Sequence, residues 1–234
     1  MRHGSTPFLL SALPGLPGLG EAAPIDAPGL MAVVRATSAA PLVEAVLLGD
    51  DLLLHQSVVA GRELPELPNA VLEEPQVRGE APLPPGLNCD RPDAFRVAAD
   101  CSWASWFRHL NALARQHGSG FLADWCAWEV ALRNQLVQLR AEGLGLDGDA
   151  LVITPDLAST RQEDRSLVDE AVSRVQHAED PQSQQRALDA VRIEWLDRNA
   201  PRFAFTDDEV VAYAVRLSLV LRWAAVAAAT AVDG

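Results

Sequence analysis

The segment FLADWCAWEVALRN, residues 121–134, brings together a thiol, a carboxylate, an arginine and two tryptophans, which could do chemistry. A thiol can act as a nucleophile when a base lies beside it. Glu129 and Arg133 are four residues apart, so on a helix they can pair with each other or with a neighbouring helix. The segment could therefore form a reactive pocket, a binding face or the seam of a helix bundle.

The rest of the chain contains no catalytic pattern that would favour the reactive pocket. G-x-S-x-G, H-E-x-x-H and C-x-x-C are all absent. His109 and His117 are eight residues apart, which is too far for one metal ion on a helix. The Asp pairs at 50–51 and 207–208 precede apolar helical patterns, so we interpret them as helix caps. We predict no catalytic residue, no metal, no cofactor and no enzymatic activity.

The cysteines and the charge restrict the compartment and the partners. Cys89, Cys101 and Cys126 are odd in number and lack metal spacing, which predicts free, mostly buried thiols in a reducing compartment. The net charge of −13 disfavours nucleic acid and membrane surfaces as partners. All 19 basic residues are arginine, which excludes reactions that need a lysine amine. The sequence contains no window of 18 apolar residues, so we expect no transmembrane helix.

Apolar spacings of three and four residues predict an all-α protein, a multi-helix bundle. The strongest helix runs through residues 121–139, where one apolar stripe continues for about five turns. We expect large side chains on such stripes to fill a core rather than bind a ligand. The predicted core residues are Phe121, Trp125, Trp128, Leu132, Trp195, Tyr213, Leu217 and Trp223.

Proline content divides the chain into three parts. Residues 1–63 form a predicted N-terminal helical lobe, which opens with a small extended segment at 8–14 and has a helix break at Gly49. Residues 64–94 are rich in proline and are predicted to be a linker or an extended loop without regular structure. Residues 95–234 form the predicted C-terminal helical domain.

Several charged residues lie inside or beside the apolar stripes, where each needs a partner of opposite charge. Structural ion pairs, partner-binding residues and an anion site all remain possible roles for them. The candidates are Glu129, Arg133, Arg140, Glu194, Glu209, Arg216 and Arg222.

Four segments together resemble a known family. They are FLLSALPGL (residues 8–16), FLADWCAWEVALRNQLVQLRA (121–141), RIEWL (192–196) and VAYAVRLSLVLRW (211–223). They resemble a bacterial family of largely uncharacterised proteins linked to V-type ATPases. This family looks like a shortened relative of the C-type subunit of bacterial and archaeal V-type ATP synthases, which corresponds to the d-type subunit of the eukaryotic enzyme.

The resemblance implies an all-helical funnel that does no chemistry. Such a protein lies in the cytoplasm, peripheral to the inner membrane through the ATPase complex. It joins the central-shaft subunits to the membrane rotor ring without inserting into the bilayer, and it passes torque between them. Two alternatives remain: a stand-alone helical adaptor or regulatory protein with no role in rotation, and an enzyme with a pocket around Trp125, Trp128 and Arg133.

Overall fold

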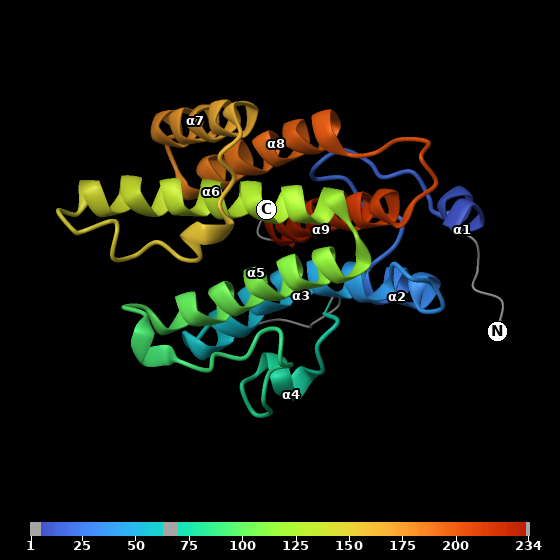
Figure 1. Cartoon of the computed structure of the whole chain (residues 1–234), viewed down its shortest axis with the longest axis horizontal. Coiled ribbons are helices and arrows are strands. Elements are labelled where there is room, and N and C mark those ends of the chain that lie inside the picture. The colour runs from blue at the N-terminus through green and yellow to red at the C-terminus, as the bar shows by residue number, and fades with distance from the viewer. Residues whose placement is uncertain (1–5, 63–69, 233–234) are drawn as a thin grey trace. The chain divides into compact units, whose positions relative to one another are not determined.

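The computed structural model describes residues 6–62 and 70–232, and all regular structure within them is helical (Figure 1). This confirms the predicted all-α class. The chain forms two compact units, which are residues 1–85 with 201–234 and residues 86–200. The division differs from the predicted one, because the last helix belongs to the same unit as the N-terminal part of the chain.

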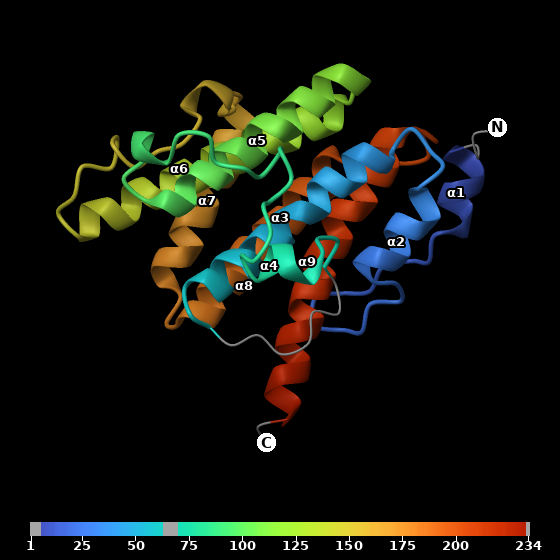
Figure 2. The same ribbon diagram turned by 90° about the horizontal axis from the view of Figure 1, so that it is seen from below.

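In the first unit, two long helices pack along each other. They are α3 (Ala40–Val59) and α9 (Asp207–Val232), which lie side by side in both ribbon views (Figures 1 and 2). The short helix α2 (Ala27–Val34) contacts both of them, and α1 (Thr6–Ala12) contacts α9. Asp26 caps α2 by accepting from the Gly29 N–H at 2.7 Å, as its position before the helix predicts.

Two local predictions for this unit are wrong. Residues 6–12 form α1 instead of an extended segment. The chain does not break at Gly49, which lies buried inside α3, so Asp50 and Asp51 are interior residues and not caps. Glycine costs a helix only about 1 kcal/mol. The buried apolar residues on both sides of Gly49 outweigh that cost because they pack against the neighbouring helices.

The proline-rich stretch contains structure that its composition does not predict. Its described part, residues 70–94, includes the short helix α4 (Glu74–Val77) and the 3-10 turn η1 (Pro92–Ala94). Leu72, Val77 and Leu87 are buried, so this part packs as an ordered segment and not as a free linker. Residues 64–69 lie outside the described residues.

Two side chains of α3 hold α4 at both of its ends. The buried carboxylate of Asp51 accepts from the Val71 and Leu72 N–H groups, both at 2.7 Å. One turn later, His55 Nδ1 lies 3.0 Å from the Gln76 carbonyl oxygen. Burial raises the pKa of Asp51 to about 6, although the two backbone hydrogen bonds lower it.

The second unit is a set of four helices that contact one another in chain order. They are α5 (Ala98–His117), α6 (Gly120–Gly143), α7 (Gln162–His177) and α8 (Pro181–Asn199), with the 3-10 turn η2 (Pro155–Leu157) against α6. Gly118 ends α5 with a φ of 69°, which a residue without Cβ adopts readily. Ser119 then caps α6 by accepting from the Leu122 N–H.

The cysteine prediction is wrong for two of the three residues. Cys89 and Cys101 form a disulfide that joins the segment before η1 to the first turn of α5. Cys126 is free, and it is buried in α6. The pairing could not be predicted, because a separation of 12 residues matches no motif and depends on how the segment folds back.

The last helix is the one described element that is long and apolar enough to cross a bilayer, over Asp207–Ala229. In its most apolar window, 56% of the residues are buried inside the protein, and buried core helices of soluble proteins pass the same test. The final turns of α9 extend beyond α2 and α3 (Figure 2). Ala225, Ala228 and Ala229 are exposed there.

Candidate functional site: the tryptophan seam and its ion pairs

The large residues of the 121–134 segment form a packed seam. We call Phe121, Trp125 and Trp128 of α6, with Trp195 of α8, the tryptophan seam. The Trp195 ring centroid lies 5.2 Å from that of Trp125, 5.6 Å from Trp128 and 5.8 Å from Phe121. All four side chains are buried, as is Leu132 one turn further along α6. The rings pack against one another, so the seam stabilises the contact between α6 and α8.

Arg192 of α8 lies at the centre of the largest buried ion cluster. Its Nε and Nη2 donate to the two carboxylate oxygens of Glu129 at 2.6 and 3.1 Å, and Nη1 donates to Asp189 at 2.8 Å. The exposed fractions of these side chains are 17% for Arg192, 11% for Glu129 and 0% for Asp189. We call these three residues the Arg192 cluster. Burial alone lowers the pKa of Arg192, but the two carboxylates raise it by more, so Arg192 stays protonated.

Glu129 and Arg133 each pair with a neighbouring helix, which is one of the two alternatives that their spacing allows. Arg133 turns to α5, where it donates to Asp100 at 2.7 Å and lies 5.1 Å above the Trp103 ring. The sequence allowed a partner on a neighbouring helix but could not identify it. Arg192 was not among the predicted residues, although Asp189 three positions earlier is a spacing that signals an ion pair.

A second buried carboxylate ties α7 to the seam. Asp164 is 2% exposed and accepts from the indole N–H of Trp195 and from Nε of Arg161, both at 2.9 Å, and from the Ser159 hydroxyl. Burial raises the pKa of Asp164, and these hydrogen bonds lower it by more, so the net shift is downward and the carboxylate is ionised. Arg161 also donates to Asp124 of α6 at 2.7 Å.

The other predicted residues of the second unit lie nearer the surface. Glu194 accepts from Arg174 of α7 at 2.7 Å and lies 3.7 Å from Arg198. Arg140 is exposed near the end of α6. Asn134 exchanges two hydrogen bonds with the backbone of Ile153, at 2.8 and 2.9 Å, and so holds the segment between α6 and α7.

The predicted residues of the first unit lie on α9. Leu217 and Trp223 are buried, but Tyr213 is only half-buried, because its hydroxyl donates to the Pro14 carbonyl at 2.9 Å. Arg222 donates to Asp50 of α3 at 2.6 Å. Arg216 is half-buried. Glu209 accepts backbone N–H groups from the loop before α9.

Cys126 is a passive thiol in this arrangement. Burial, with a smaller contribution from Glu129, raises its pKa to about 12. Its Sγ donates to the Phe107 carbonyl at 3.4 Å. A nucleophilic cysteine needs a lowered pKa and some exposure, and Cys126 has neither.

Hollows large enough to hold a small ligand include one in each unit. One, of about 430 Å³ in the second unit, is lined by polar side chains that include Asn134, Gln138, Asp149 and Arg165. No His or Cys lines it, and Gln138 donates to Asp149 at 3.1 Å. Its polar side chains can form hydrogen bonds, and Ser159, which also lines it, donates to Asp164.

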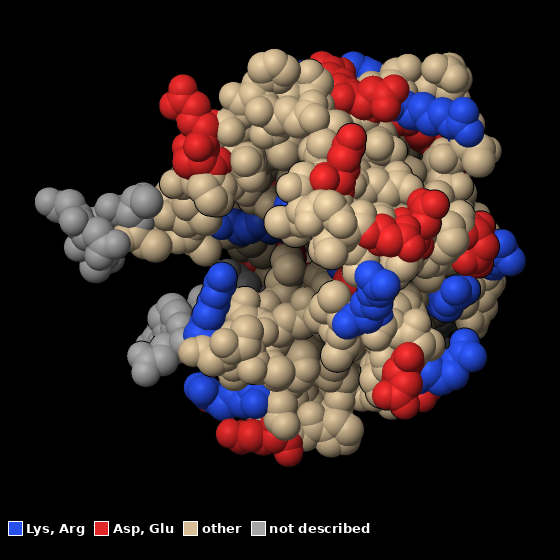
Figure 3. Space-filling view, turned by 90° about the vertical axis from the view of Figure 1, so that its left-hand side faces the viewer, with Lys and Arg blue, Asp and Glu red and all other residues tan. Residues whose placement is uncertain are grey.

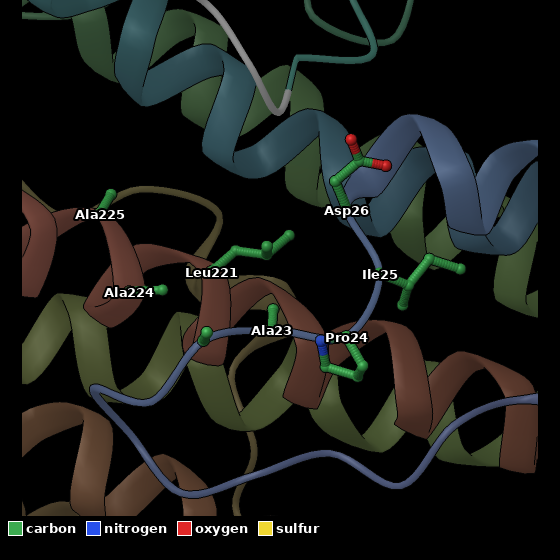
Figure 4. Close-up of a pocket in the computed structure, with 8 residues that line it drawn as sticks. Ala23, Pro24, Ile25, Asp26, Leu221, Ala224 and Ala225 are labelled. Atoms are coloured by element: carbon green, nitrogen blue, oxygen red, sulfur yellow. The ribbon is translucent and has the colours of Figure 1, made fainter.

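The other hollow lies in the first unit, between the loop at 22–26 and α9, with a volume of about 660 Å³. Figure 4 shows Leu221 extending from α9, with Ala23 and Pro24 of the loop below it in this view. Asp26 is its one charged lining residue, and that carboxylate caps α2. The hollow is therefore mainly apolar.

The charged groups described above link helices to one another. Among the described residues, no three His, Cys, Asp or Glu side chains gather as a metal would require. On the face in Figure 3, acidic and basic side chains are interspersed, with no broad patch of one sign. The network in the second unit connects α6 to α5, α7 and α8 and favours a stiff element.

Comparison with known protein families matches most of the second unit and the last helix. The family described as "Protein of unknown function (DUF2764)" matches residues 103–231, more than half of the chain. No curated protein and no solved structure matches the chain.

Proposed function

We propose that this chain, which belongs to the DUF2764 family of unknown function, is a noncatalytic connector of a bacterial V-type ATPase. It would join the central-shaft subunits to the membrane rotor ring. This function requires a stiff helical body with partner-binding faces, and it requires no active site.

One observation carries the proposal: the separate segments of the resemblance meet in space. In the second unit, Arg192 of the segment at 192–196 binds Glu129 of the segment at 121–141, and Trp195 packs on Trp128. Segments that match by chance have no reason to share the principal contacts of a fold. The meeting of these two supports a common architecture behind the resemblance.

The same holds in the first unit. Tyr213, in the segment at 211–223, donates to the carbonyl of Pro14, in the segment at 8–16. These two residues are 199 positions apart in the chain. The first and last segments of the resemblance are thus joined directly.

The Arg192 cluster also suits a part that passes torque. A bidentate arginine–carboxylate pair fixes direction as well as distance. Together with the Arg133–Asp100 pair to α5 and the Arg161–Asp124 pair to the start of α7, it limits sliding of α6 against its neighbours, because sliding would separate each charge from its partner.

Binding to purified V-type ATPase parts tests the proposal. We expect the chain to bind the isolated shaft subcomplex and the detergent-solubilised rotor ring in a one-to-one complex on size exclusion. The variant Arg198→Met changes an exposed arginine and should bind equally well. Failure to bind either part, with the chain folded, would count against the connector and for a stand-alone adaptor. ATPase genes beside this gene would favour the connector.

A further inference from the structure

Three phenylalanines of the first unit are exposed to an unusual degree. The exposed fraction is 85% for Phe203, 52% for Phe205 and 75% for Phe8. Phenylalanine side chains bury on the order of 200 Å² when they pack, so leaving them in water forgoes a large hydrophobic gain. Exposed aromatic residues that lie close together in a fold mark an interaction surface.

The backbone holds two of these side chains outward at a conformational cost. Phe203 and Phe205 have φ values of 58° and 55°, in the left-handed region that bulky residues avoid. In this region the Cβ of an L-residue lies too close to the following carbonyl oxygen, so the conformation is unfavourable. The Glu209 carboxylate stabilises the loop at 201–206, because its two oxygens accept from the Phe203 N–H at 3.1 Å and the Phe205 N–H at 2.9 Å.

The third phenylalanine is brought to the same end of the unit. The Thr6 hydroxyl of α1 donates to the Asp207 carboxylate at the start of α9, at 3.1 Å. Phe8 is two residues from Thr6, and Phe205 is two residues from Asp207. We call the two loop residues Phe203 and Phe205 the aromatic face.

The charges next to the aromatic face are mainly negative. Asp207, Asp208 and Glu209 follow Phe205 closely, and Arg202 is the one cation within residues 201–209. This acidic flank repels anionic lipid headgroups and phosphate backbones. It attracts a surface that carries arginine or lysine.

We infer that the aromatic face docks a protein partner that presents an apolar cavity flanked by basic side chains. The phenylalanines fill the cavity, and the carboxylates at the start of α9 face the basic residues. The loop is held by Glu209 before the partner arrives, which lowers the ordering cost of binding. This inference stands independently of the proposed function, because it rests on exposure, backbone geometry and charge.

Site-specific photo-crosslinking in cells of the native host tests it with the full chain. A benzophenone-bearing phenylalanine analogue replaces Phe203 or Phe205, and the matched control places it at Val59, which is 66% exposed in the same unit. We expect one protein adduct at 203 and 205, with a yield several-fold above that at 59. Its crosslinked peptide should contain apolar residues beside Arg or Lys.

Two variants separate docking from folding. Phe205→Ser in the chain carrying the probe at 203 should lower adduct yield about tenfold while leaving the thermal melting temperature unchanged. Asp208→Asn should lower it by a smaller factor, and added salt should do the same in lysate. A yield equal to that at Val59 would overturn the inference. So would an adduct mainly with lipid, with a second copy of this chain, or with a peptide that lacks basic residues.

Discussion

Replacing Arg192 with methionine removes the cation of the Arg192 cluster and keeps a side chain of similar length. The change leaves Glu129 and Asp189 buried without the guanidinium that binds both. The matched control is Arg198→Met, on the same helix, because Arg198 is 58% exposed and lies 3.7 Å from its carboxylate.

The magnitude follows from burial. Removing one partner of a buried ion pair costs about 3–5 kcal/mol of unfolding free energy, because a charge is left without compensation. Glu129 keeps 11% of its side chain in solvent, and Asp189 still accepts from Gln185 at 3.0 Å, so we expect the lower end, about 3 kcal/mol. Arg198→Met should cost less than about 1 kcal/mol, as exposed pairs do.

Urea unfolding followed by tryptophan fluorescence measures both variants, since the tryptophan seam adjoins the cluster. The double variant Glu129→Leu with Arg192→Met removes both charges and should recover part of the loss. A loss for Arg192→Met no greater than that for Arg198→Met would refute the argument that this cluster braces the second unit.

Three further predictions concern single groups. Burial raises the pKa of Asp51 to about 6, so the folded state binds this proton more tightly than the unfolded state, and stability falls as pH rises from about 4 to 6. In urea unfolding across this range, the wild-type protein should lose about 2–3 kcal/mol that Asp51→Asn does not lose. Parallel curves of stability against pH for the two proteins would contradict this. Cys89→Ala should lower the free energy of unfolding by about 3 kcal/mol relative to the wild-type protein in non-reducing urea, and should not lower it in reducing buffer. Equal stability of the two proteins in both buffers would argue against the disulfide. Iodoacetamide at pH 8 should label Cys126 far more slowly in native than in urea-unfolded protein, as intact mass reports, because burial raises its pKa to about 12; rapid native labelling would contradict its burial.

The sequence predicted well what local periodicity determines. The apolar stripe at 121–139 predicted α6, and the apolar spacings of three and four residues predicted the all-α class. These features depend on residues within one or two turns of each other. For the same reason, the predicted burial of the tryptophan seam required no knowledge of tertiary structure.

The sequence predicted poorly what depends on distant contacts. Asp51 has the position of a cap in the sequence, but the segment at 71–72 supplies its donors in the fold. Glu129 and Arg133 have the ideal spacing for a pair, yet each has a stronger partner on another helix. The conformation of the loop at 201–206 was missed, because no sequence pattern signals a phenylalanine with positive φ. Glu209, four positions after Phe205, is part of the support of this loop.

A density map of the V-type ATPase isolated intact from the native host tests the central proposal most directly. We expect density for α5 to α8 at the junction between the shaft and the rotor ring, with this chain present in the same amount as the shaft subunits. An intact, active complex whose junction is filled by other proteins, from cells that express this chain, would contradict it.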